Sequence, residues 1–189
     1  NAKALFQLHG GCQWDKYLAD RALGGILPNL NPYGGLQWLD LNDRQPRLIG
    51  FDKTLPAGQT CGVTALDDRQ FLMTFSSHHA VAKDGSPLPS GSFLVLADRD
   101  TRKPDLIPMP KVPLGGKLTN GFSGVPRTDG RLLALNNRSS HAVALLDVVD
   151  RRNPKVLKAW RLAGNPDLCT FWKGKLVIPA GHQGLLMAK

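Results

Sequence analysis

Histidine and cysteine are the residues of this sequence that are best suited to chemistry. The histidines are His9, His78, His79, His141 and His182, and the cysteines are Cys12, Cys61 and Cys169. Imidazole and thiolate groups are good ligands for zinc, copper or iron. The spacings CxxC, HxH and HExxH do not occur in the sequence. A transition-metal site would therefore have to be assembled by the fold, and the alternative is that these are ordinary polar loop residues.

Three similar segments indicate which elements would position these side chains. Each consists of an apolar strand, an acidic turn, a proline and a second apolar strand: residues 36–49, 93–107 and 143–157. The equivalent positions are Asp40, Ala97 and Asp147, 57 and 50 residues apart. A fourth copy starts at Gly184. A period of about 40 to 50 residues is typical of the blades of a β-propeller.

Two further short strands precede each of the later copies. They are joined by turn pairs that favour hairpins, namely Asp67-Asp68, Asp129-Gly130 and Lys173-Gly174. Each complete unit is thus predicted to be a sheet of four antiparallel strands, A to D. The units are residues 35–56 (strands C and D), 57–112, 117–163 and 166–189. One such sheet leaves both faces apolar, so neighbouring sheets must stack.

This pattern resembles the LVIVD-type and YncE-like repeat propellers. Residues 142–154, AVALLDVVDRRNP, match their strand, acidic turn and proline best, and the resemblance covers residues 35–188. It implies the propeller fold. It implies no function, because such propellers serve as enzymes, binding modules and scaffolds.

The first part of the chain departs from the repeat. Residues 4–8 form a predicted strand B, and residues 10–34 a predicted insertion with a short helix at 14–23. Residues 80–92 form a second long loop. We therefore predict an all-β chain, residues 1–189, that forms a single partial propeller of about three and a half blades. Another chain, or a larger parent protein, is expected to complete the ring.

The blade cycle places all five histidines in connections between strands B and C, and hence at one end of the propeller. The predicted metal ligands there are His78, His79, His141 and His182, with zinc, copper or iron as the metal. Cys169, between apolar neighbours, is predicted to be a buried structural thiol. The acids of the turns at the other end, including Asp67 and Asp68, are predicted to hold those turns by hydrogen bonds.

Composition narrows the function classes. Hydrophobic residues make up 42% and charged residues 21% of the chain, which is typical of a globular protein. The net charge of +9 is spread beside turns, so we expect a solvated rim rather than a nucleic-acid site. No apolar run is long enough for a membrane span. The odd number of cysteines leaves the redox compartment open.

We interpret the chain as a non-catalytic binding or scaffold subunit, since no catalytic motif is recognisable. It would engage a protein partner through the loop-rich end that carries the histidines and cysteines, with Trp14, Tyr17 and Tyr33 as partner contacts. The alternative is a metal-containing enzyme or electron-transfer subunit that uses the same end. The predicted location is periplasmic or extracellular.

Overall fold

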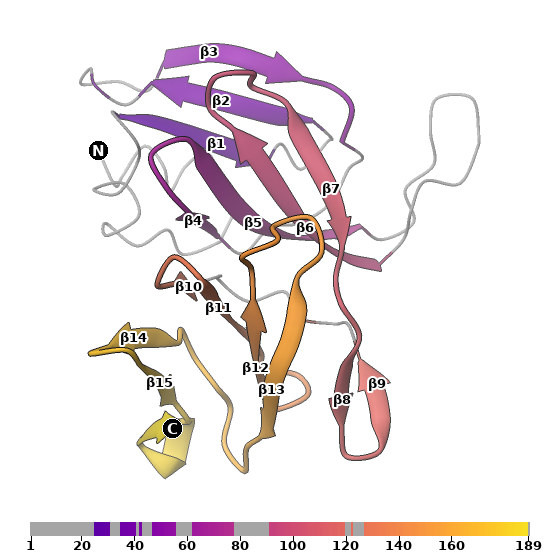
Figure 1. Ribbon diagram of the computed structural model, residues 1–189, viewed down its shortest axis with the longest axis vertical. Coiled ribbons are helices and arrows are strands. Elements are labelled where there is room, and N and C mark those ends of the chain that lie inside the picture. The colour runs from indigo at the N-terminus through magenta and orange to yellow at the C-terminus, as the bar shows by residue number, and fades with distance from the viewer. Residues whose placement is uncertain are drawn as a thin grey trace.

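The chain is a stack of short antiparallel β-sheets (Figure 1). A computed structural model describes residues 25–30, 35–40, 42, 47–55, 62–77, 91–119, 122 and 127–188. The predicted strand at 4–8, the helix at 14–23 and most of the loop at 80–92 lie outside these ranges. No helix among the described residues is long and apolar enough to cross a membrane.

Two of the sheets have four strands, paired in chain order. One consists of β4 (Val63–Ala65), β5 (Gln70–Ser77), β6 (Gly91–Asp98) and β7 (Pro104–Pro108). The other consists of β10 (Arg127–Thr128), β11 (Leu132–Asn137), β12 (Ala142–Asp147) and β13 (Lys155–Arg161). All their pairings are antiparallel. These are the complete A–D blades that the repeat predicts.

The two end sheets have three strands each. The first consists of β1 (Ile26–Leu30), β2 (Leu36–Asp40) and β3 (Arg47–Asp52). The last consists of β14 (Thr170–Trp172), β15 (Lys175–Pro179) and β16 (Leu185–Ala188), with a 3-10 turn η1 (Gly181–Gln183) between β15 and β16. These four sheets hold fourteen strands, and with them the described part of the chain is an open β-propeller of about three and a half blades. The two end sheets lie at opposite ends of the stack (Figure 1).

Three apolar layers hold the stack together, one between each pair of neighbouring sheets. Alternate residues of one strand enter different layers: Phe93, Val95 and Ala97 of β6 face the first sheet. Leu94 and Leu96 face the third sheet, where they meet Leu133 and Leu135. Between the third and fourth sheets lie Ala134, Val143, Cys169, Leu176 and Ile178. The strict alternation of strand side chains is what lets each sheet serve two layers.

Arginines in the turns between strands C and D connect neighbouring sheets. Arg102, in the β6–β7 turn, donates to the Ile49 carbonyl of the first sheet, and its own carbonyl accepts from Trp38 Nε1 at 2.9 Å. Arg151, in the β12–β13 turn, pairs with Asp67 Oδ2 of the preceding sheet at 2.6 Å. Both arginines stand four residues after the aspartate that ends strand C, Asp98 or Asp147. Each turn thus reaches back to the sheet before it.

The structure corrects the sequence prediction near the start of the described residues. Residues 26–30, which the sequence placed in the insertion 10–34, form β1 and pair with β2 along its full length. Pro28 hides this strand in the sequence, but β1 is an edge strand in its sheet, where a missing N–H is tolerated. The equivalent repeat position is also Asp98 and not Ala97, because Asp98 ends β6 as Asp40 ends β2.

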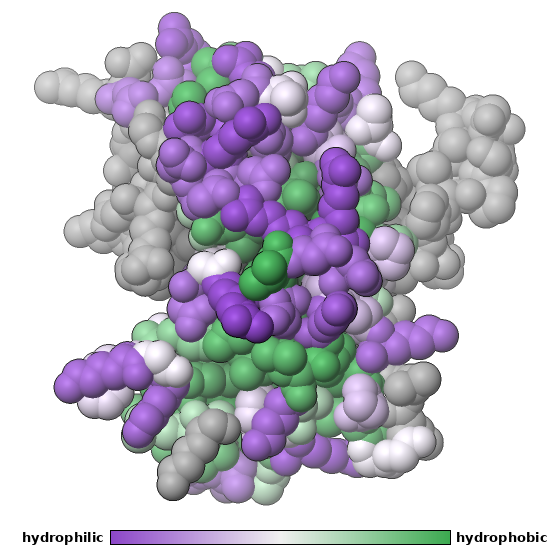
Figure 2. All heavy atoms as spheres, viewed as in Figure 1, coloured by the Kyte–Doolittle hydropathy of each residue, from purple (hydrophilic) through white to green (hydrophobic). Residues whose placement is uncertain are grey.

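A further difference concerns the link between the second and third sheets. A hairpin of β8 (Val112–Leu114) and β9 (Lys117–Thr119) was not predicted, although its Gly115-Gly116 turn has the positive φ angles, 56° and 79°, that suit glycine. Strand A of the third sheet includes β10 at 127–128, and residues 121 and 123–125, which the sequence assigned to this strand, lie outside the described residues. Apolar side chains gather over the lower sheets in Figure 2, whereas hydrophilic ones cover most of the upper sheets.

Candidate functional site

The candidate site begins at the connection between strands B and C of the third sheet. Residues 138–141 join β11 to β12. The turn is closed by Ser140 N, which donates to Asn137 Oδ1 at 3.0 Å, and by His141 N, which donates to the Arg138 carbonyl at 3.2 Å. Asn and Ser favour such turns because their side chains bond the nearby backbone. His141 ends the turn with a φ of 53°, a region that side-chain-bearing residues rarely adopt.

The segment between β13 and β14 lies directly against this turn. Leu162 N donates to the His141 carbonyl at 2.7 Å. Asn136 Nδ2 donates to the Pro166 carbonyl at 3.4 Å, and Arg138 pairs with Asp167 at 2.6 Å. Residues 162–167 are thus fastened to the 137–141 turn by both backbone and side-chain bonds.

The connection between β15 and β16 completes the site. Gln183 Oε1 accepts from the backbone N–H groups of Ala163 and Gly164, at 3.0 and 3.2 Å. A Cβ at Gly164 would stand 2.1 Å from the Ala180 carbonyl oxygen, so only glycine permits this approach. We call residues 137–141, 162–167 and 180–184 together the loop platform. It joins the third and fourth sheets at the same end of both.

Two of the four predicted metal ligands lie on the loop platform. His141 Nδ1 is 3.4 Å from the Ala163 carbonyl oxygen. His182 Nδ1 lies 3.3 Å from the place where a Cβ of Gly164 would stand. The fold thus brings both imidazoles to residues 163–164. The other predicted ligands, His78 and His79, lie outside the described residues, as do His9, Cys12, Cys61, Trp14, Tyr17 and Tyr33.

Cys169 lies beneath this end of the molecule rather than on its surface. Its residue is 2% exposed, within the layer between the third and fourth sheets. Burial, and then the nearby charge of Asp167, raise the pKa of the Cys169 thiol to about 12. The thiol donates to the Asp167 carbonyl at 3.7 Å. A thiol in these surroundings stays protonated at neutral pH, so Cys169 is a structural side chain and a poor metal ligand.

Within the described ranges, no three His, Cys, Asp or Glu side chains lie close enough together to hold a metal ion. Two buried polar atoms, one beside the loop platform and one on it, were not foreseen from the sequence. Asn136, 4% exposed, and Ser140 each have one side-chain oxygen without a hydrogen-bond partner among the described residues. No sequence signal marks them, because their neighbours come from segments far away along the chain.

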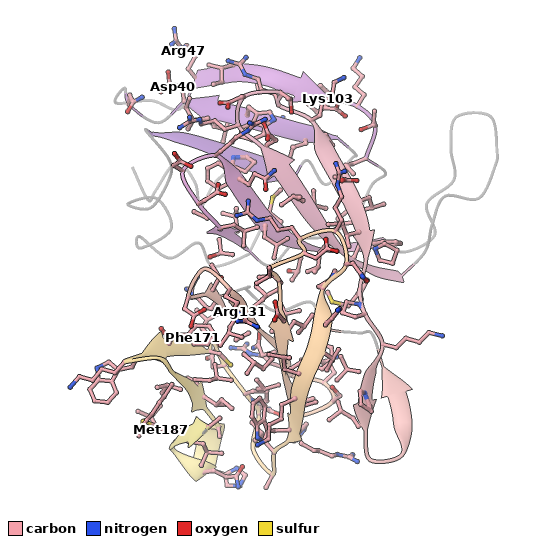
Figure 3. The ribbon with its side chains drawn as sticks, viewed as in Figure 1. Asp40, Arg47, Lys103, Arg131, Phe171 and Met187 are labelled. Atoms are coloured by element: carbon pink, nitrogen blue, oxygen red, sulfur yellow. The ribbon has the colours of Figure 1, made fainter. Side chains whose placement is uncertain are left out.

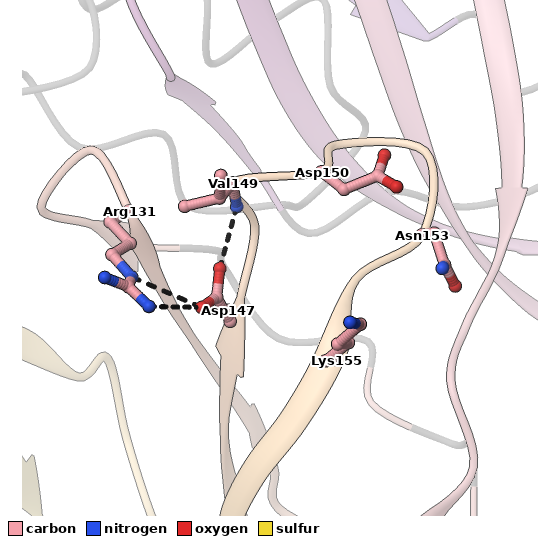
Figure 4. Close-up of a pocket in the computed structure, with 6 residues that line it drawn as sticks. All are labelled: Arg131, Asp147, Val149, Asp150, Asn153 and Lys155. Carbon is pink, nitrogen blue, oxygen red and sulfur yellow. Dashed lines mark hydrogen bonds and ion pairs between the residues drawn. The ribbon is translucent and has the colours of Figure 1, made fainter.

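At the opposite end of the sheets, aspartates hold the turns. Asp147 Oδ1 accepts from Val149 N at 2.9 Å, and Asp147 Oδ2 pairs with Arg131 at 2.9 Å (Figure 4). The Val149 N–H and then the Arg131 guanidinium lower the pKa of the Asp147 carboxyl. In the first sheet Asp40 pairs with Arg47, which begins strand D instead of lying in an A–B turn (Figure 3). Asp67 accepts from Arg69 N and Gln70 N, which confirms its predicted role as a turn holder.

Two cavities open at this opposite end. One, of about 280 Å³, is drawn in Figure 4 and is lined by Arg131, Asp147, Val149, Asp150, Asn153 and Lys155. The other, of about 510 Å³, lies in the second sheet and includes Arg152, which pairs with Asp105 at 2.7 Å. The charges that line both are largely engaged with one another, so these cavities are weaker candidates than the loop platform.

The chain was compared with known proteins. No protein-family model and no curated protein matches it. Among solved structures, a putative 6-phosphogluconolactonase from Bacteroides fragilis is 13% identical, with a TM-score of 0.42, over 89% of this chain and 68% of that chain. The β-propeller domain of Cps50 (Swd1) from Myceliophteria thermophila is 10% identical, with a TM-score of 0.40, over 87% and 66%. BamB from Moraxella catarrhalis is 14% identical, with a TM-score of 0.31, over 87% and 66%. At these values the neighbours carry no argument about a site.

Proposed function

We propose that this chain is a non-catalytic binding or scaffold subunit that holds a protein partner on the loop platform. One observation carries the proposal: three segments from two adjacent sheets are joined by backbone and side-chain bonds into one polar surface. A surface ordered before binding loses little conformational entropy when a partner arrives. Loops held by a rigid scaffold are also where binding residues are most often found.

The test is site-specific photocrosslinking in cells that produce the chain. A photoreactive residue at Ser139, on the exposed part of the platform, is expected to form covalent adducts with a protein partner. The same residue at Asp150, exposed at the other end of the sheets, is the matched control. Adducts that form at 150 and not at 139 would contradict the proposal. Trp14, Tyr17 and Tyr33 stay predicted partner contacts, and probes at these positions test them in the same way.

A second candidate function is that of a metal-containing enzyme or electron-transfer subunit. The observation that favours it is the approach of His141 and His182 to the same two residues, 163 and 164. Elemental analysis of the purified chain after exposure to Zn²⁺, Cu²⁺ or Fe²⁺ tests it. A stoichiometric metal that is lost in the double variant His141→Ala, His182→Ala would favour this function over the first.

Two finer predictions accompany the proposal. The relationship to LVIVD-type and YncE-like propellers rests on the sequence repeat, and the periplasmic or extracellular location stays a prediction. Fractionation of cells that express the full-length protein tests the location.

A further inference from the structure

The larger of the two cavities lies where the second sheet meets the β12–β13 turn of the third sheet. Its volume of about 510 Å³ is within the range of about 300 to 1,000 Å³ that is typical of sites for small molecules. The charged residues that line it are Arg69, Asp98, Lys103 and Asp105 of the second sheet and Arg152 of the third. Both sheets have four strands, and any further sheet would stack against β1–β3 or β14–β16, so the cavity is not at an end of the stack.

The two carboxylates of the lining are already paired with arginines. Arg69 Nε donates to Asp98 Oδ2 at 2.7 Å, and Arg152 Nε pairs with Asp105 Oδ2 at 2.7 Å. Because both contacts are made through Nε, the Nη–H groups of these arginines remain for another acceptor. The Lys103 ammonium forms no hydrogen bond or ion pair with any other residue that the structure describes. With three cations and two carboxylates, the lining carries one positive charge in excess.

Comparison of the first two sheets shows why the charge of Lys103 is left over. In the first sheet Arg47 lies opposite Asp40, the last residue of strand C, and pairs with it at 3.1 Å. Lys103 occupies the same place in the second sheet, since its carbonyl accepts from Asp98 N at 3.3 Å. Here, however, Arg69 from the A–B turn pairs with the carboxylate of Asp98. Lys103 is therefore not needed to hold the strand ends together, and its ammonium is available to a ligand.

We propose that this cavity binds a small organic anion, a carboxylate or a phosphate ester, whose charged group lies between Lys103 and Arg152. A guanidinium group binds the oxygens of a carboxylate or phosphate in pairs, and an ammonium adds a point charge. The lining also contains Leu96 and Pro104, which suit an apolar part of the ligand. Such a ligand contacts two sheets at once. The proposal goes beyond the proposed function, because none of these residues belongs to the loop platform.

An NMR titration of the nitrogen-15-labelled chain tests the proposal with three probes of similar size. Benzoate and phenyl phosphate carry the two kinds of anionic group, and benzamide is the neutral counterpart of benzoate. Both anions are expected to cause saturable shifts of the amide signals of residues 101–105 and 152, and the tighter of the two identifies the group that the site prefers. The absence of a saturable shift with either anion overturns the proposal. So does benzamide if it binds as tightly as benzoate, or an anion that shifts only signals from other parts of the chain.

A matched pair of variants then tests the residue that supplies the excess charge. Lys103→Gln breaks no ion pair with a described residue, so it should keep the fold, which circular dichroism checks. It is expected to bind both anions about two- to five-fold more weakly, as for one exposed ion pair. Lys111→Gln, at an exposed lysine outside the lining, is the control and should bind like the wild type. Equal affinity of the wild type and Lys103→Gln would overturn the proposal.

Two further measurements complete the test. Arg152→Gln removes the contribution of the third sheet and should weaken binding of the anions to a similar extent. Sodium chloride should weaken the binding of the anions to the wild type, because the cations of the lining are exposed to solvent. Binding that neither change affects contradicts a charged site. Crosslinking at Ser139 in the Lys103→Gln chain tests the loop platform independently, so failure of one proposal leaves the other decidable.

Discussion

Replacing Asp98 by asparagine should destabilise the second sheet, and the loss should depend on pH. The side chain of Asp98 is 14% exposed, at the end of β6. Its carboxylate accepts from the backbone N–H groups of Asp100 and Thr101, at 3.0 and 2.9 Å, and from Arg69 Nε at 2.7 Å. Desolvation alone would raise the pKa of Asp98. The bonds from Thr101, Arg69 and Asp100 outweigh it and lower the pKa from 3.8 to about 2.

The size of the effect follows from this difference. A fall of the pKa from 3.8 to about 2 corresponds to about 2.5 kcal/mol of unfolding free energy at neutral pH. Because the folded-state pKa is the lower one, this contribution is complete above pH 3.8 and is lost as the pH falls toward 2. Asparagine keeps one oxygen acceptor for the backbone donors. We therefore expect Asp98→Asn to lower the free energy of unfolding by about 1 to 2 kcal/mol at pH 7.

Urea unfolding of the wild type and of Asp98→Asn, at pH 7 and at several values between 4 and 2, measures this quantity. The two chains should differ clearly at pH 7 and converge toward pH 2. Asp68→Asn, in the neighbouring A–B turn, is the control for removing one surface carboxylate. A loss that stays the same at pH 7 and pH 2, or that Asp68→Asn equals, would refute the reasoning.

Three further predictions follow from other parts of the structure. His141 has a φ of 53°, which glycine adopts without strain, so His141→Gly should raise the free energy of unfolding by up to about 1 kcal/mol in urea titrations. The same variant should weaken partner crosslinking at Ser139. Leu94 is fully buried between the second and third sheets, so Leu94→Ala should lower the free energy of unfolding by about 2 to 5 kcal/mol. Leu157 is half-exposed on β13, so Leu157→Ala should lower it far less. Thermal and urea unfolding of the two variants measure the difference. Peptide mapping after treatment with a thiol reagent should find Cys169 unmodified in the folded chain and modified in urea.

The repeat predicted the sheets well where two paired strands and the turn between them lie within one short segment of the sequence. The segment from β12 to β13 is an example, because the apolar alternation, Asp147 and the following turn all lie within a few residues. The repeat did not predict β1, because Pro28 is untypical of a strand. Residues 26–30 are recognised as a strand only from their pairing with β2. The repeat also missed the β8–β9 hairpin, whose strands of three residues are too short to show alternation.

The candidate site was predicted only in outline. The blade cycle assigned His141 and His182 to equivalent connections, and the structure places both beside residues 163–164. The bond from Gly164 to Gln183 and the pair of Arg138 with Asp167 were not foreseen, since each depends on how two sheets pack. Long-range contacts of this kind leave no periodic signal in a sequence.

The arginines that reach back from each C–D turn also bear on how such a protein can change over evolution. Arg102 and Arg151 belong to the turn of their own repeat, and each engages the sheet before it. A duplicated repeat therefore brings along the connector that attaches it to its neighbour. The receiving repeat provides two side chains for Arg151, Asp67 and Gln70, and one backbone carbonyl, that of Ile49, for Arg102. The attachment of a duplicated repeat would therefore depend on whether the repeat before it offers acceptors of this kind.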